Sequence, residues 1–91
     1  MKAYVVTLAF VNGLPDQEVS AAQKAFLDKL YGEGALIASG PFNDGAGGMA
    51  LLRFDSLEQA REIYRESPIV RSGHVTFELR EWNVLIGSIQ R

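Results

Sequence analysis

Few polar residues in this chain are placed to do chemistry, and Gln23 is the first of them. It follows Val19 by four residues and precedes Phe26 by three, so in a helix it lies on or beside the apolar stripe. A buried side-chain amide must find hydrogen-bond partners. Gln23 therefore either faces a ligand in a pocket, or lies at the edge of the stripe and reaches solvent or backbone.

Two ionisable residues are further candidates. His74 is the only histidine, and its side chain titrates near neutral pH, so it is the candidate general acid–base group. The sequence places no carboxylate beside it, which favours a structural or solvated histidine instead. Arg71 could steer an anionic substrate, although exposed arginines in loops are usually solvated.

The apolar run Leu36–Phe42 predicts a buried strand that ends in a corner of small residues at Ser39 and Gly40. Glycine has no side chain in the way, so backbone groups at this corner can approach a ligand closely. Tight packing at a strand end explains the same residues equally well. Ser39 is not a predicted nucleophile, because the sequence provides no adjacent base to activate it.

Length and composition limit the other functions. The 91 residues predict a single domain, residues 1–91, and the net charge of −2 argues against nucleic-acid binding. With no cysteine and one histidine, we expect no metal site and no bound cofactor.

The glycine-rich stretch 45–48 lacks the lysine and helix of a phosphate loop, so it predicts a hairpin turn. The apolar run before Asn12 is too short for a membrane span or signal, which predicts a cytoplasmic protein with no membrane partner.

Hydropathy patterning predicts the elements that position these residues. The expected strands are residues 2–10, 35–41, 48–54 and 74–83, and the expected helices are residues 17–32 and a second one between Ser56 and Pro68. Asp16 is the predicted N-cap of the first helix, and Gly32 and Gly34 are its predicted stop. The predicted core stripe of that helix is Val19, Ala22, Phe26 and Leu30.

The second helix begins with a capping-box pattern, Ser56 followed by Gln59, and Asp55 with Glu58 offers the same pattern one residue earlier. Its apolar stripe includes Tyr64. The segment 84–89 is apolar enough for another short strand or for an edge swapped with a partner.

The order βαββαβ predicts an α+β, ferredoxin-like domain, in which a four-stranded antiparallel sheet carries both helices on one face. The other sheet face is then left open. Both faces of residues 2–10 are largely apolar, so a second copy of the sheet covers this face better than water. We therefore expect a homodimer that packs through its sheet faces. RNA-recognition domains share the element order, but residues 49–54 lack their pattern of stacking aromatic and basic residues.

Five short segments follow one another in a characteristic order: Phe26-Leu27, Gly34–Pro41, Gly47-Gly48-Met49, Ser67–Gly73 and Glu81-Trp82. Together they resemble the YciI-like (YCII-related) family of the dimeric α/β-barrel superfamily, over nearly the whole chain. The resemblance implies a ferredoxin-like domain that forms a dimeric α/β barrel through its sheet. Family members are mostly uncharacterised, and some are thought to be small enzymes acting on cyclic or aromatic compounds.

The resemblance also implies an active pair, from which this chain departs. The family's proposed pair is a histidine three residues before the Phe-Leu and an aspartate just before the proline after the second helix. Here these positions are Gln23 and Ser67. Neither side chain titrates in the useful range, so a proton relay built on that pair is lost.

Two functions stay open at this stage. The absent pair favours a small protein with a ligand pocket that is non-catalytic or weakly catalytic, or an interaction module. The alternative is a cofactor-free lyase, isomerase or dehydrohalogenase acting on a small cyclic or aromatic compound, using His74 or a bound water. The expected ligand-binding residues are Gln23, Ser39, Gly40, Ser67 and Arg71.

Overall fold

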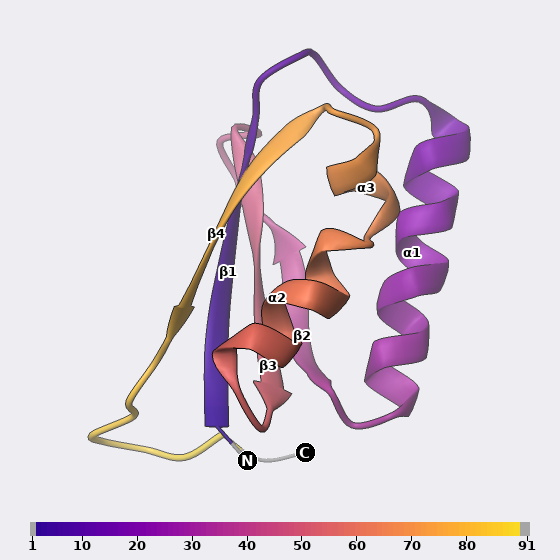
Figure 1. The fold of residues 1–91 in the computed structure, drawn as a ribbon. Coiled ribbons are helices and arrows are strands. Elements are labelled where there is room, and N and C mark those ends of the chain that lie inside the picture. Colours follow the sequence, from indigo (N-terminus) through magenta and orange to yellow (C-terminus); the bar gives the residue numbers. More distant parts are fainter. Residues whose placement is uncertain (1, 90–91) are drawn as a thin grey trace.

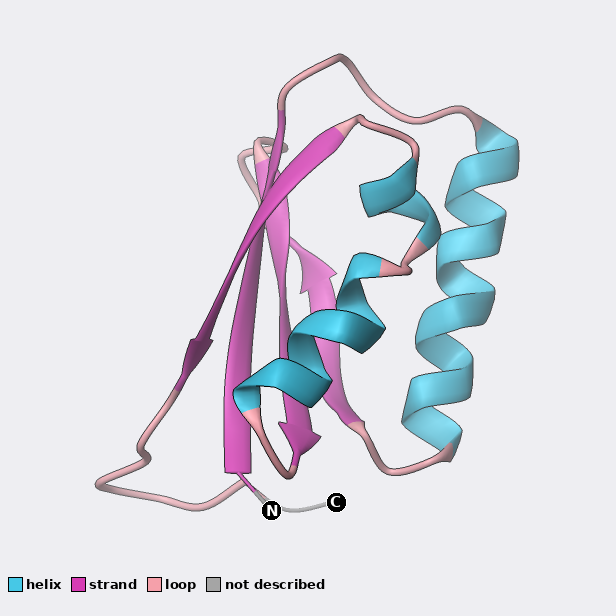
Figure 2. Cartoon of the chain, in the orientation of Figure 1, coloured by secondary structure: helices cyan, strands magenta, loops and turns pink. Residues whose placement is uncertain are grey.

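A computed structural model describes residues 2–89 and shows a four-stranded sheet with all of its helices on one face (Figures 1 and 2). The elements are β1 (Lys2–Phe10), α1 (Gln17–Gly32), β2 (Leu36–Pro41), β3 (Gly47–Phe54), α2 (Leu57–Arg65), α3 (Pro68–Arg71) and β4 (Val75–Glu81). The strand order is β2-β3-β1-β4, and each neighbouring pair is antiparallel. The predicted ferredoxin-like fold is confirmed.

The caps that begin the two long helices are the predicted ones. The Asp16 side chain accepts the Val19 N–H at 2.9 Å, and the Ser56 hydroxyl accepts the Gln59 N–H at 3.1 Å. The Gln59 side chain then accepts the N–H of Asp55, at 3.0 Å, rather than that of Ser56. Each cap satisfies a backbone donor that the first helical turn would otherwise leave without a partner.

The end of α1 depends on Gly34 rather than on Gly32. Gly34 has a φ of +83°, and its N–H donates to the Tyr31 carbonyl while that of Ala35 donates to the Leu30 carbonyl. This pair of bonds is a Schellman motif, which requires the left-handed conformation that glycine adopts without strain. The motif turns the chain directly into β2.

The short helix α3 has no counterpart among the predicted elements. The break that Pro68 predicts is present, because α2 ends at Arg65 and Ser67 is extended. Pro68 then starts a further helical turn, a position where its missing N–H costs nothing. This extra turn brings Ile69 against α1.

The core lies between the helices and one face of the sheet. Its fully buried members include Tyr4, Val6, Leu52, Ala60 and Tyr64. Two predictions of burial are wrong. Ala22 is exposed, because α1 turns Gln23 toward the sheet instead. The strand predicted as buried at Leu36–Phe42 is exposed from Ala38 onward, because β2 lies at the edge of the sheet. No helix among residues 2–89 is long and apolar enough to cross a membrane.

The other face of the sheet is covered by none of the helices of residues 2–89 (Figure 2). Val5 lies opposite Leu51 on β3 and Arg80 on β4, and these residues alternate with the core positions of β1. Met49 belongs to the same face and is exposed. This surface, centred on Val5, Leu51 and Met49, is called the open face below.

The segment after β4 does not form the predicted short strand. β4 ends at Glu81 rather than at residue 83, and residues 84–89 form no strand. The alternative, an edge swapped with a partner, stays a prediction. The segment instead loops back toward the start of β1, and Arg53 Nη2 donates to the Ile89 carbonyl at 2.7 Å (Figure 1). Without strand partners among residues 2–89, Leu85 and Ile86 are left 93% and 96% exposed.

Candidate functional site

A cavity of about 700 Å³ lies between α1 and the end of the sheet formed by β2 and β3. Its wall is mainly apolar, with Leu27, Leu36 and Val75 among the lining residues. Three of the predicted ligand-binding residues, Gln23, Ser39 and Gly40, line this cavity together. The structure therefore brings the middle of α1 and the small-residue corner of β2 to one place.

Gln23 is buried in the cavity wall, with 8% of its surface exposed. Its Oε1 accepts the backbone N–H of Ile69 at 3.0 Å, so the amide carbonyl is engaged. Its Nε2 is buried beside the Tyr64 hydroxyl and makes no well-formed hydrogen bond to any described residue. The side-chain oxygen of Gln23 therefore serves the fold, and its nitrogen is enclosed within the cavity wall.

Tyr64 lies beside Gln23 in the same wall and is 1% exposed. Its ring packs edge-on against Phe26, with centroids 6.0 Å apart, and tilted against Phe77 at 5.8 Å. Its hydroxyl lacks a well-formed hydrogen bond to any described residue. Burial raises the pKa of Tyr64 to about 12, and the neighbouring Gln23 amide offsets part of that rise.

Tyr64 is a residue that the sequence-based search for functional residues missed. Its position in the apolar stripe of α2 predicts core packing, which its ring confirms. A tyrosine in a stripe still carries a hydroxyl that must find a partner when buried. The need of a buried hydroxyl for a hydrogen bond was the signal available in the sequence. The Tyr64 hydroxyl lacks a well-formed hydrogen bond to any described residue.

Two glycines allow the strands to meet beside the cavity. A Cβ on Gly47 would collide with the Leu8 carbonyl, and a Cβ on Gly48 would lie 2.8 Å from the Gly40 carbonyl oxygen. At Gly40 itself a Cβ would meet nothing within 4 Å. Close packing therefore explains Gly47 and Gly48 but not Gly40, where an added side chain would meet open space.

The rim of the cavity carries an ion pair that the search for functional residues did not single out. Lys24 Nζ and Asp28 Oδ2 lie 2.8 Å apart, one helical turn from each other on α1. Both side chains are mostly exposed, so the pair contributes little to stability. Their i, i+4 spacing was readable in the sequence.

The remaining predicted site residues lie outside the cavity lining. Ser67 is fully buried, and its hydroxyl has no partner among residues 2–89. Arg71 is exposed and pairs with Glu66 at 3.2 Å. His74 is half-buried, and its Nδ1 lies 3.0 Å from the Asn12 carbonyl oxygen.

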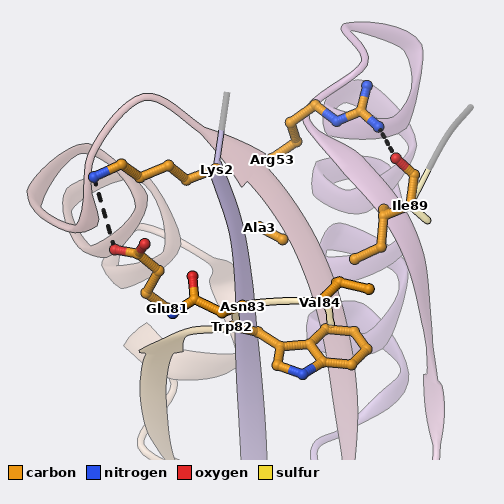
Figure 3. A pocket seen from close by; sticks show the side chains of 8 residues that line it. All are labelled: Lys2, Ala3, Arg53, Glu81, Trp82, Asn83, Val84 and Ile89. Carbon is orange, nitrogen blue, oxygen red and sulfur yellow. Dashed lines mark hydrogen bonds and ion pairs between the residues drawn. The ribbon is translucent and has the colours of Figure 1, made fainter. Parts of the chain in front are cut away.

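A second cavity, of about 620 Å³, lies where the segment after β4 returns to β1 and β3 (Figure 3). Lys2 Nζ lies 3.9 Å from a Glu81 carboxylate oxygen, and Arg53 turns toward the Ile89 carbonyl. Both cationic groups in its wall already have partners. Among residues 2–89, no three acidic, histidine or cysteine side chains gather as a metal site. The cavity at Gln23 is therefore the stronger candidate.

Comparisons with known proteins match this fold. The family model of the YCII-related domain matches residues 3–83. The uncharacterized protein YjpA of Bacillus subtilis (strain 168) is 41% identical over 69 residues, which cover 76% of this chain and 81% of the relative.

Two solved structures with little sequence identity share the arrangement. The 5-chloro-2-hydroxyhydroquinone dehydrochlorinase TftG from Burkholderia phenoliruptrix AC1100, in complex with 2,5-dihydroxybenzoquinone, has a TM-score of 0.70 at 14% identity; the match covers 89% of this chain and 93% of TftG. A muconolactone isomerase has a TM-score of 0.75 at 15% identity, over 98% of this chain and 96% of the isomerase. At these identities the likeness shows the fold alone.

Proposed function

Because the chain belongs to the YCII-related family, in which it has glutamine and serine at the positions of the implied active pair, we propose that it is a small ligand-binding protein. Its ligand site is the cavity between α1 and the sheet, and the ligand is a small cyclic or aromatic compound. The protein is non-catalytic or weakly catalytic, because neither Gln23 nor Ser67 can exchange a proton near neutral pH.

One observation carries this proposal. Two polar side chains, those of Gln23 and Tyr64, lie beside each other in the wall of a mainly apolar cavity. Apolar surroundings with a few convergent polar groups are typical of small-molecule sites.

The contacts of Gln23 and Ser67, which occupy the positions of the implied active pair, give a second reason to propose that the proton relay is lost. Ser67 has no hydrogen bond to Gln23, and it does not line the cavity. Gln23 uses its carbonyl to hold α3 through Ile69. The two residues therefore do not form a coupled pair in this chain, and Gln23 is proposed as a binding residue only.

A thermal-shift screen tests the proposal. The compounds are small phenols, quinones, lactones and short carboxylates, measured with the wild type, Gln23→Leu and the control Gln17→Leu. Gln17 is an exposed residue at the start of the same helix. A ligand at a hundredfold excess over its Kd stabilises the native state by about 2.7 kcal/mol. The proposal expects a shift that Gln17→Leu keeps and Gln23→Leu loses; no shift with any compound would contradict it.

The alternative is a cofactor-free enzyme of the lyase, isomerase or dehydrohalogenase type. It is favoured by the two structural neighbours, a dehydrochlorinase bound to a dihydroxybenzoquinone and a lactone isomerase. The charged residues that line the cavity are Lys24 and Asp28. Turnover of a bound lactone or chlorinated hydroquinone, followed by NMR and abolished in Asp28→Asn, would favour this function over simple binding.

The proposed assembly is a homodimer through the open face. This face carries apolar side chains that none of the described helices covers, among them those of Val5, Leu51 and Met49. Leu85 and Ile86 add almost fully exposed apolar surface just after β4. Exposed apolar patches of this kind mark protein–protein contacts, and a domain this small gains stability from pairing.

A further inference from the structure

We infer that the second cavity, at the start of β1, binds an aromatic monocarboxylate, with the Arg53 guanidinium holding the carboxylate and the Trp82 indole packing against the ring (Figure 3). The inference goes beyond the proposed function and does not depend on it. The second cavity shares no lining residue with the cavity at Gln23.

The sheet register places Arg53 and Trp82 on either side of Ala3. Arg53 on β3 lies opposite Ala3 on β1, and on the other side of β1 the Trp82 N–H donates to the Ala3 carbonyl at 2.9 Å. Because side chains alternate along a strand, these three residues lie on the open face, two positions from Val5. Ala3 is small, so space remains between the guanidinium and the indole. The returning segment completes the wall with Asn83, Val84 and Ile89.

Arg53 has a hydrogen-bond partner but no counter-charge among residues 2–89. Its Nη2 donates to the main-chain carbonyl of Ile89 at 2.7 Å, and that acceptor is neutral. None of the ion pairs of the described residues includes Arg53. A guanidinium carries five N–H donors, and this bond uses one of them. The bond therefore orients the guanidinium and leaves its charge unbalanced.

The other two charged groups of the wall balance each other. Lys2 Nζ lies 3.9 Å from a Glu81 carboxylate oxygen (Figure 3). Glu81 lies opposite Tyr4, a core position, so its side chain leaves the sheet on the side opposite to that of Arg53. With two cations and one anion in its wall, the cavity carries one net positive charge. A monoanion matches this charge, and a carboxylate fits the planar fork of an arginine.

The apolar part of the wall favours a flat ring as the body of the ligand. Trp82 is 45% exposed, and Ala3, Val84 and Ile89 add apolar atoms around it. Aromatic pairs gain free energy beyond the area that they bury. A neutral aromatic compound gives Arg53 no anion, and an aliphatic acid gives the indole no ring. An aromatic carboxylate uses both groups.

Three probes with a six-membered ring test the inference: benzoate, its neutral analogue benzamide, and cyclohexanecarboxylate. Trp82 is the only tryptophan, so its indole N–H gives a single NMR signal that reports on this cavity. Titrations that follow this signal should show benzoate binding about tenfold more tightly than benzamide. Benzoate should also bind about threefold more tightly than cyclohexanecarboxylate. An indole signal that benzoate does not shift, or equal affinities for benzoate and benzamide, would overturn the inference.

Two replacements of Arg53 separate its charge from its contact with the returning segment. Arg53→Gln removes the charge and keeps an N–H donor for the Ile89 carbonyl, so it should abolish the preference for benzoate over benzamide. Arg53→Lys keeps the charge and should retain that preference to within about threefold. Arg61→Gln makes the same change on the exposed surface of α2 and should behave as the wild type. If Arg53→Gln weakens benzoate and benzamide equally, the charge of Arg53 is not what selects the ligand, and the inference fails.

Two further variants test the ring contact and the location of the ligand. Trp82→Leu, followed through the ligand's own NMR signals, should bind benzoate and cyclohexanecarboxylate equally; a remaining preference for benzoate would remove the indole from the site. Gln23→Leu should leave the response of the Trp82 signal to benzoate unchanged, because Gln23 belongs to the other cavity. A response lost in Gln23→Leu would place benzoate in that other cavity and overturn this inference, while leaving the proposed function in place.

Discussion

The side-chain carbonyl of Gln23 accepts the backbone N–H of Ile69 at 3.0 Å, and this bond ties the middle of α1 to the first turn of α3. The two residues are 46 positions apart in the sequence. The nitrogen of the same amide is buried beside the Tyr64 hydroxyl in the cavity wall. One side chain thus joins α1 to α3 and forms part of the wall of the proposed site.

Replacing Gln23 by leucine should lower the free energy of unfolding by about 1–3 kcal/mol, because the Ile69 N–H is then buried without an acceptor. Urea denaturation measures this loss. Gln17→Leu makes the same replacement on the exposed surface of α1 and should stay within about 0.5 kcal/mol of the wild type. Equal stability of the two variants would mean that the bond to Ile69 contributes nothing.

Tyr64→Phe, unlike Gln23→Leu, should not lower the free energy of unfolding at neutral pH. The hydroxyl is buried without a well-formed hydrogen bond, so its removal deletes a desolvation cost and keeps the aromatic contacts with Phe26 and Phe77. The variant should unfold within about 0.5 kcal/mol of the wild type or at higher urea concentration. A loss above about 1 kcal/mol would show that the hydroxyl is well paired in solution.

The raised pKa of Tyr64 also predicts a dependence of stability on alkaline pH. The unfolded tyrosine loses its proton near pH 10, whereas the folded one keeps it until about pH 12. In that window the native state binds more protons than the unfolded state, so stability falls as pH rises. Between about pH 10 and about pH 12, the wild type should therefore lose more stability than Tyr64→Phe. Parallel pH profiles of the two proteins would contradict the assigned shift.

The sequence predicted those features of the fold that depend on local chemistry. Asp16 and Ser56 begin their helices because their side chains satisfy backbone donors within three residues, which sequence spacing alone reveals. Gly34 ends α1 for a similarly local reason. The antiparallel sheet with its helices on one face follows from the element order and from the handedness of the crossovers.

The features that the sequence did not predict depend on distant contacts. The single turn of α3 is too short to show helical periodicity, and it is held by the Gln23 amide from α1. The segment 84–89 is apolar like a strand, yet it is held by Arg53 and forms no strand. The cavity brings Gln23 and Tyr64 together from two helices, and no spacing in the chain encodes that meeting.

Three glycines near the cavity should respond differently to alanine. Gly47→Ala and Gly48→Ala place a methyl group against backbone atoms of the neighbouring strands, which cannot move without disturbing the sheet. Each should lower stability by about 1–3 kcal/mol or more. Gly40→Ala meets nothing within 4 Å and should leave the melting temperature nearly unchanged. Equal losses at all three positions would mean that the strands are not packed as described.

The last prediction concerns the open face. If two copies pack through it, light scattering at micromolar concentration should give twice the monomer mass. Val5→Glu places a carboxylate at the centre of that face, beside Leu51, where burial in the dimer would strip it of water. This variant should therefore be monomeric.

Val11→Glu is the matched control, because Val11 follows β1 and is already 53% exposed. It makes the same change outside the sheet and should leave the dimer intact. A Val5→Glu protein that remains folded and dimeric would place the interface elsewhere on the molecule. A wild type that is monomeric at the same concentration would remove the assembly proposal altogether, but not the ligand proposal, because the cavity at Gln23 is lined by residues of a single chain.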